Sequence, residues 1–124
     1  MRPVDQTTYG FDDGNCFPAC VASILETSID QVPHSQGVSL GFLQWLASLG
    51  LSATLYKSAN HVPRGYSIAA GPSMRFGGRL HACVAYDGAI VHDPHPSRDG
   101  LPLGIEDYVV LHGWHGEPLW FSGL

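Results

Sequence analysis

Residues 80–93, Leu-His-Ala-Cys-Val-Ala-Tyr-Asp-Gly-Ala-Ile-Val-His-Asp, carry the strongest fold signal in this chain. Two apolar runs, residues 80–86 and 89–93, flank the dipeptide Asp87-Gly88. An Asp-Gly pair favours a tight turn between antiparallel strands, because that turn needs backbone angles that these two residue types tolerate. We therefore expect a β-hairpin here.

Further strands are expected on both sides of this hairpin. Residues 51–57 and 66–71 precede it, and residues 108–111 follow it. Each segment is short, mostly apolar and bounded by residues that are typical of turns. Together with the hairpin, these segments predict an antiparallel sheet.

Two helices are expected before the strands. The first runs from Cys16 to about Glu26, and its Pro18 is tolerable because it falls in the first turn. The second begins after Ser39, a favourable N-cap, and ends at Gly50. Helices followed by strands predict an α+β fold, with the helices packed on one face of the sheet.

Length and composition indicate a single domain spanning residues 1–124. The formal net charge is −5 and no basic cluster occurs, so we expect no nucleic-acid partner, since phosphate binding needs several positive charges on one face. No apolar stretch is as long as a membrane span, so no membrane association is expected. The first residues hold no apolar signal core, which favours a cytoplasmic location. Nothing in the sequence indicates the oligomeric state.

The cysteines point to a reactive thiol, because three is an odd number and too few for a disulfide scaffold. Cys16 begins the first expected helix and directly follows a predicted turn, Asp12-Asp13-Gly14-Asn15. Free N–H groups and the dipole at a helix start favour a thiolate, and they can hold the oxyanion that forms when a carbonyl is attacked. Cys20 and Cys83 fit the core, so Cys16 is the candidate nucleophile.

A candidate base and its partner lie on the hairpin. His81 opens the first strand and Asp93 closes the second. Neighbouring strands are only about 5 Å apart, so the two side chains can meet at one end of the sheet. There an imidazole can serve as general base for Cys16, while the carboxylate fixes its tautomer and supports its positive charge.

This meeting places a condition on the hairpin. With a strict two-residue turn, His81 and Asp93 would point to opposite faces of the sheet. A three-residue loop, Asp87-Gly88-Ala89, would bring both to the same face, and a bulge within either strand would have the same effect. We expect the three-residue loop or such a bulge, and a His81–Asp93 hydrogen bond of about 2.7–3.2 Å.

The order of these motifs resembles that of papain-like cysteine peptidases. The matching blocks are residues 14–25, Gly-Asn-Cys-Phe-Pro-Ala-Cys-Val-Ala-Ser-Ile-Leu, then 81–86, His-Ala-Cys-Val-Ala-Tyr, and then 91–94, Val-His-Asp-Pro. The branch that looks most similar is that of the bacteriocin-processing, double-glycine leader peptidases. The resemblance implies the papain-like fold, a catalytic triad of Cys16, His81 and Asp93, and a peptide or protein substrate.

Two positions depart from the family pattern. The family has an oxyanion-hole glutamine about six residues before the nucleophile, whereas Gln6 lies ten residues before Cys16. Residues 9–14 could loop out and return Gln6 to the site, and Asn15 is a rival donor. Phe17 stands where the family commonly has glycine, which narrows the space beside the sulfur and weakens the inference about leader-peptide specificity.

Two alternatives remain beside the hydrolase. Cys16, Cys20, His81 and His92 form a conceivable zinc set, but the paired knuckles of structural zinc sites are missing, so we expect no metal and no cofactor. A non-catalytic peptide-binding domain of the same fold is the second alternative. A cysteine hydrolase that works through an acyl-enzyme is favoured over it, because a binder has no need for Cys, His and Asp together. His92, His95 and residues 94–100 could shape the rim of the cleft, but a solvated proline loop is the preferred prediction for them.

Overall fold

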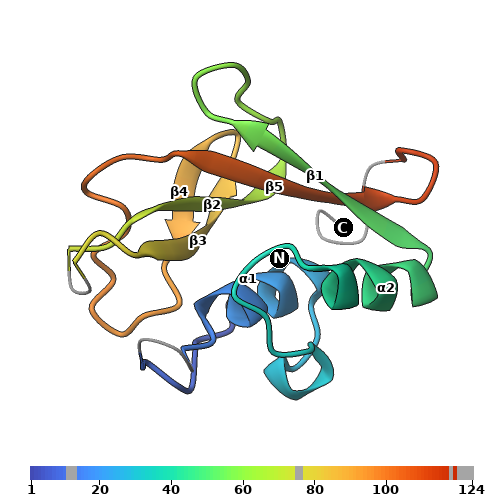
Figure 1. Cartoon of the computed structure of the whole chain (residues 1–124), viewed down its shortest axis with the longest axis horizontal. Helices are drawn as coiled ribbons and strands as arrows, with labels where there is room; N and C mark the ends of the chain where they lie inside the picture. The colour runs from blue at the N-terminus through green and yellow to red at the C-terminus, as the bar shows by residue number, and fades with distance from the viewer. Residues whose placement is uncertain (11–13, 75–76, 118, 120–124) are drawn as a thin grey trace.

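The computed structural model describes residues 1–10, 14–74, 77–117 and 119 (Figure 1). The Asp12-Asp13 pair of the predicted turn lies outside the described residues. In chain order the described elements are α1 (Cys16–Leu25), η1 (Ile29–Gln31), α2 (Leu40–Ser48), β1 (Leu51–Lys57), β2 (Tyr66–Pro72), β3 (Leu80–Tyr86), β4 (Ala89–His92) and β5 (Asp107–Gly113).

The described strands form one antiparallel sheet in the order β1-β5-β2-β3-β4. Both α-helices lie on the same side of this sheet, with α1 packed on β3 and β2 and α2 packed on β1 (Figure 1). The predicted α+β class, with helices on one face, is therefore confirmed. Strand β5 is longer at both ends than the predicted segment 108–111.

Helix α1 is the centre of the core because it is apolar on every side. Its residues 17–24 are all buried, and Ala19 and Ala22 are small enough to let the helix approach the sheet closely. Pro18 falls in the first turn, where its missing N–H removes no helical hydrogen bond. The burial of this helix holds its first residue, Cys16, against the end of β3.

Helix α2 begins and ends at the predicted signals. The Ser39 side chain accepts a hydrogen bond from the Phe42 N–H at 3.2 Å, which confirms the N-cap. The chain leaves the helix through Gly50, whose φ of +74° is a left-handed angle that glycine adopts without strain. Among the described residues, no helix is long and apolar enough to cross a membrane.

The hairpin between β3 and β4 combines a two-residue turn with a bulge. Tyr86 pairs with Ala89, and Asp87 and Gly88 form the turn with φ values of +50° and +84°. Two contacts hold this turn: the Gly65 N–H donates to the Asp87 carboxylate at 2.7 Å, and the Tyr108 hydroxyl donates to the Gly88 carbonyl. The predicted three-residue loop is therefore wrong.

The bulge supplies the register shift that the three-residue loop was expected to give. Ala85 pairs with Ile90, but the next pair is Val84 with His92, so Val91 is the extra residue. Beyond the bulge, every residue of the second strand moves to the other face. This shift brings residue 93 to the face that carries His81, as the alternative of a bulge within a strand predicted.

Candidate active site

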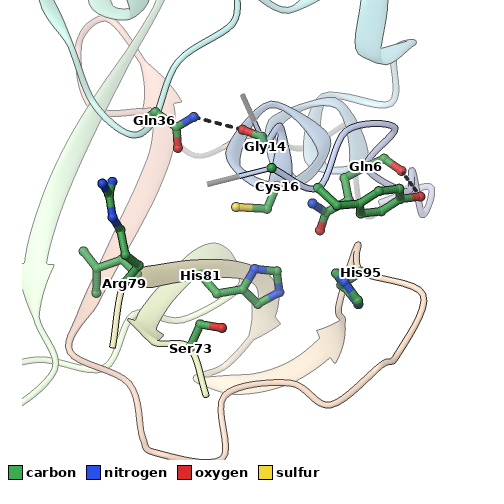
Figure 2. Close-up of a pocket in the computed structure, with 11 residues that line it drawn as sticks. Gln6, Gly14, Cys16, Gln36, Ser73, Arg79, His81 and His95 are labelled. Atoms are coloured by element: carbon green, nitrogen blue, oxygen red, sulfur yellow. Dashed lines mark hydrogen bonds between the residues drawn. The ribbon is translucent and has the colours of Figure 1, made fainter. Parts of the chain in front are cut away.

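Cys16, His81 and Asp93 come together where α1 begins and β3 starts. His81 Nε2 donates a hydrogen bond to Asp93 Oδ1 at 2.7 Å, within the expected range. The other ring nitrogen, Nδ1, remains for Cys16, and the sulfur hydrogen-bonds with the imidazole. Figure 2 shows the sulfur and the imidazole facing the same pocket. The three residues thus form a chain of contacts from a thiol through an imidazole to a carboxylate.

The Asp93 carboxylate is only 4% exposed and accepts three N–H groups. Besides His81, the His95 N–H donates to Oδ1 at 2.9 Å and the Gly100 N–H donates to Oδ2 at 2.8 Å. Burial would raise the pKa of Asp93, but the hydrogen bonds from His81, His95 and Gly100 outweigh it and lower the pKa to about 2. The carboxylate is therefore charged at neutral pH.

The electrostatics of the pair favour a thiolate beside an imidazolium. Burial would raise the pKa of Cys16, but the hydrogen bond and charge of His81, together with the N–H groups of Ala82 and Phe17, lower it. Burial would lower the pKa of His81, but hydrogen bonds with Asp93, Cys16 and Cys83 raise it to about 11. Both shifts favour transfer of the thiol proton to the imidazole, and so favour a thiolate–imidazolium pair before any substrate is bound.

The other two cysteines are fully buried, as predicted. Burial raises the pKa of Cys83, and it raises the pKa of Cys20 well above its usual value, so both remain unreactive thiols. The set of Cys16, Cys20, His81 and His92 does not come together, because His92 Nε2 donates to the Val4 carbonyl at 3.0 Å.

One group of side chains in the described part of the chain has metal-ligand chemistry. The ligand atoms of His81, Cys83 and Asp93 lie within 4.8 Å of one another. His81 and Asp93, however, are already joined by a 2.7 Å hydrogen bond, which a metal ion would have to break. The observed contacts are those of an oriented imidazole rather than of a ligand set.

Gln6 lies in the pocket beside Cys16 and His81 and is only 5% exposed (Figure 2). Its Nε2 donates one hydrogen bond to the Thr8 carbonyl at 2.9 Å, while its buried Oε1 has no partner among the residues that the structure describes. A primary amide has two N–H groups, so the second is left for a ligand in the pocket. Gln6 therefore has the position and the chemistry of an oxyanion donor.

Asn15 has its amide engaged elsewhere. Its Oδ1 accepts the N–H groups of Thr7 and Thr8 at 2.9 and 3.0 Å, and its Nδ2 donates to the Thr7 hydroxyl at 2.8 Å. These bonds tie the segment next to Gln6 to the start of α1. Asn15 also lines neither cavity beside the Cys16 sulfur, whereas Gln6 lines one of them, so Gln6 is favoured as the donor and Asn15 supports the Gln6 segment.

Two backbone hydrogen bonds account for the unusual spacing of Gln6 and Cys16. The Gly14 N–H donates to the Gly10 carbonyl at 3.0 Å, and the Asn15 N–H donates to the Thr8 carbonyl at 3.2 Å. These contacts bring Gly14 next to Gly10 and Asn15 next to Thr8, so Gln6 lies beside the nucleophile despite the ten-residue spacing. Gly14 suits this position because a Cβ there would lie 2.7 Å from the Gly10 oxygen.

Two cavities open beside the sulfur and the imidazole. The first, of about 260 Å³ and called the polar cavity below, is lined mostly by residues with polar side chains, and the second, of about 190 Å³, is mainly apolar. Phe17 forms part of the apolar wall and packs edge-to-face on Phe42 with ring centroids 5.1 Å apart. The polar cavity is lined by Gln6, Tyr9, Gly10, Gly14, Cys16, Gln36, Ser73, Arg79, Leu80, His81 and His95, and the apolar cavity by Cys16, Phe17, Gln36, Gly37, Val38, Leu55, Ile68, Ala70, Leu80, His81, Ala82, Asp107 and Val109.

The sequence analysis missed one residue of the pocket, Gln36, and preferred a solvated loop over a place at the cleft for another, His95. His95, predicted to belong to a solvated loop, lines the polar cavity, and its ring lies edge-on to His81 with centroids 6.3 Å apart. Its place two residues after Asp93 was the one available signal. Gln36 lines both cavities and donates to the Gly14 carbonyl at 3.0 Å (Figure 2). No local pattern marks Gln36.

Comparison with known proteins finds no relative: no family model matches the sequence, and neither does any curated protein or solved structure.

Proposed function

We propose that this chain is a cysteine hydrolase with a papain-like fold, similar to the double-glycine leader peptidases, acting on an amide bond of a peptide or protein. The observation that carries the proposal is the contact chain at the site. Asp93 binds His81 Nε2 at 2.7 Å, which leaves Nδ1 for a Cys16 thiol at a helix start. A buried carboxylate, an imidazole and a lowered thiol pKa in this order suit nucleophilic catalysis.

The reaction begins with attack of the Cys16 thiolate on the substrate carbonyl carbon. The carbonyl oxygen takes up the electron pair and becomes an oxyanion, which the Gln6 amide and the free Cys16 N–H stabilise. The C–N bond then breaks while the His81 imidazolium gives its proton to the leaving amine. The product of this half-reaction is a thioester on Cys16 and a released amine.

Water completes the cycle. Neutral His81 takes a proton from a water molecule, and the resulting hydroxide adds to the thioester carbonyl. The C–S bond breaks, Cys16 leaves as a thiolate, and the acid product departs. His81 is again an imidazolium paired with Cys16 and Asp93, as at the start.

An activated ester tests this proposal without knowledge of the natural substrate. Wild type is mixed with p-nitrophenyl acetate, and we expect a burst of nitrophenol and an acetyl group on Cys16, located by peptide mass mapping. Cys16→Ala removes the nucleophile, and His81→Ala keeps the thiol but removes its proton acceptor, so both should lose the burst. Wild type without acetylated Cys16 contradicts the proposal.

A peptide library then separates the two functional classes. A hydrolase cleaves a subset of the library, and cleavage is lost in Cys16→Ala. The alternative, a non-catalytic peptide-binding domain, predicts saturable binding that is equal in wild type and Cys16→Ala, with no cleaved product.

A further inference from the structure

An ion pair joins the N-terminal segment to the loop after β4. Arg98 Nη1 lies 2.7 Å from Asp5 Oδ1, and Nη2 lies 2.9 Å from Oδ2, so two parallel hydrogen bonds connect residues 93 positions apart. Arg98 Nη1 also donates to the main-chain carbonyl of Asp93. Arg98 has a φ of +56°, an angle that side-chain-bearing residues seldom adopt, so its backbone is held in place by its surroundings.

Further contacts fix the same two segments side by side. The Gln6 N–H donates to the Pro94 carbonyl at 3.1 Å, and His92 Nε2 donates to the Val4 carbonyl at 3.0 Å. His92 Nε2 also lies 3.3 Å from the Asp5 carboxylate. The residue next to Gln6 is thereby tied to the residues on both sides of Asp93.

We propose that Asp5 and Arg98 are positioning residues, which set the distance between the oxyanion donor Gln6 and the Cys16–His81 pair. This inference rests on the proposed function, because it assigns Gln6 to the oxyanion. Neither Asp5 nor Arg98 lines a cavity beside the Cys16 sulfur. Their effect on the reaction therefore passes through the main chain of residues 5–6 and 93–94.

The exposure of the Asp5–Arg98 ion pair distinguishes a positioning role from a role in stability. Asp5 and Arg98 are about half exposed, at 52% and 49%, and exposed ion pairs add little to the free energy of unfolding. The Asp93 carboxylate keeps its own three N–H donors without Arg98. Loss of the pair should therefore move Gln6 more than His81, and oxyanion stabilisation is sensitive to such small displacements.

Two probes of the same sulfur measure this difference. Iodoacetamide alkylates Cys16 without an oxyanion, whereas p-nitrophenyl acetate acylates it through one. The ratio of the two rates therefore reports the oxyanion hole. We expect Asp5→Asn and Arg98→Gln each to lower acylation roughly tenfold while changing alkylation less than about twofold. The double variant should be no worse than the more affected single variant, because both changes break the same pair.

Arg2→Gln is the matched control. Arg2 lies in the same N-terminal segment, and its guanidinium donates to the Glu26 carbonyl at 3.0 Å, at the end of α1 that is far from Cys16. It should leave the ratio unchanged. Thermal unfolding tests whether each variant is folded. If Arg98→Gln does not fold, Arg98→Lys replaces it, because lysine keeps the charge but loses the paired hydrogen bonds.

The outcomes are separable. An unchanged ratio, an equal fall in both rates, or additive effects in the double variant would each overturn the positioning role. Failure of wild type to form the acetyl-Cys16 enzyme would instead overturn the proposed function. A lowered ratio in the Asp5 and Arg98 variants, with Arg2→Gln like wild type, supports the inference.

Discussion

Replacement of Asp93 by asparagine removes one charge and leaves one N–H group without an acceptor. The carboxylate accepts three N–H groups, from His81, His95 and Gly100, at 2.7, 2.9 and 2.8 Å. An asparagine has one carbonyl oxygen and one amino group. When its oxygen faces His81 and His95, its amino group faces the Gly100 N–H, so two donors oppose each other.

The expected cost follows from these contacts. A carboxyl group whose pKa falls from its usual 3.8 to about 2 on folding stabilises the native state by about 2 kcal/mol at neutral pH. An unsatisfied buried N–H costs about 1–3 kcal/mol, and the half-buried N–H of Gly100 belongs at the lower end of that range. Because the loop can relax partly, we expect Asp93→Asn to lower the free energy of unfolding by about 3 kcal/mol at pH 7.

The pH dependence of the free energy of unfolding shows how much of this cost comes from losing the Asp93 charge. The pKa of Asp93 is lower in the folded state, so its contribution is complete above the unfolded pKa and is lost as the pH falls through 2. About half of it remains at pH 3, since both pKa values flank that pH. The stability difference between wild type and Asp93→Asn should therefore narrow by about 1 kcal/mol between pH 7 and pH 3.

Urea unfolding of wild type and variant at the two pH values measures the difference. A difference below about 1 kcal/mol at pH 7, or one that does not narrow at pH 3, would refute the assignment of Asp93 as the charged partner of His81. Asp93→Asn should also keep more acylation activity than His81→Ala, because its side-chain oxygen still accepts the His81 N–H. The alanine variant loses both the base and the positive charge.

Further variants and treatments test the same site. Iodoacetamide should modify Cys16 far faster than the two buried cysteines below pH 8, and His81→Ala should slow the modification of Cys16, as peptide mapping can show. Gln6→Ala should lower the acylation rate by p-nitrophenyl acetate roughly a hundredfold with little change in alkylation, whereas Asn15→Ala should lower both stability and acylation by loosening the segment beside Gln6. Gly14→Ala should shift the loop away from the Gly10 oxygen and reduce acylation, while circular dichroism remains that of wild type. Prolonged dialysis against EDTA should leave the acylation rate unchanged, and a rate restored only by added zinc would contradict the proposed chemistry.

The hairpin shows which part of the site could be predicted from the sequence. Side chains alternate between the two faces along any strand. For His81 and Asp93 to share a face, the pairing had to shift by one residue from that of a strict two-residue turn. The local sequence does not show whether the extra residue lies in the turn or within a strand. The Gly65 N–H and the Tyr108 hydroxyl hold the two-residue turn, and both come from other parts of the fold. The extra residue was therefore accommodated within the strand, at Val91.

The residues that sequence reasoning missed belong to contacts between distant segments. Asp5 and Arg98 lie in stretches without periodicity, and nothing local connects them. Gln6 and Asn15 carry the same amide chemistry, so spacing alone left both open as oxyanion donors. The choice between them required the structure, in which Asn15 is hydrogen-bonded to Thr7 and Thr8. These contacts follow from how the N-terminal segment folds over the start of α1.

The extra residue at Val91 has a consequence for how the site can be lost. A bulge acts as a phase shift: it reassigns every later side chain to the opposite face and leaves the earlier ones untouched. Deletion of this one codon would preserve the turn and every residue of the site. It would nevertheless direct the carboxylate of the following Asp-Pro pair away from the imidazole. The presence of one extra residue in β4 therefore decides whether Asp93 and His81 lie on the same face of the sheet.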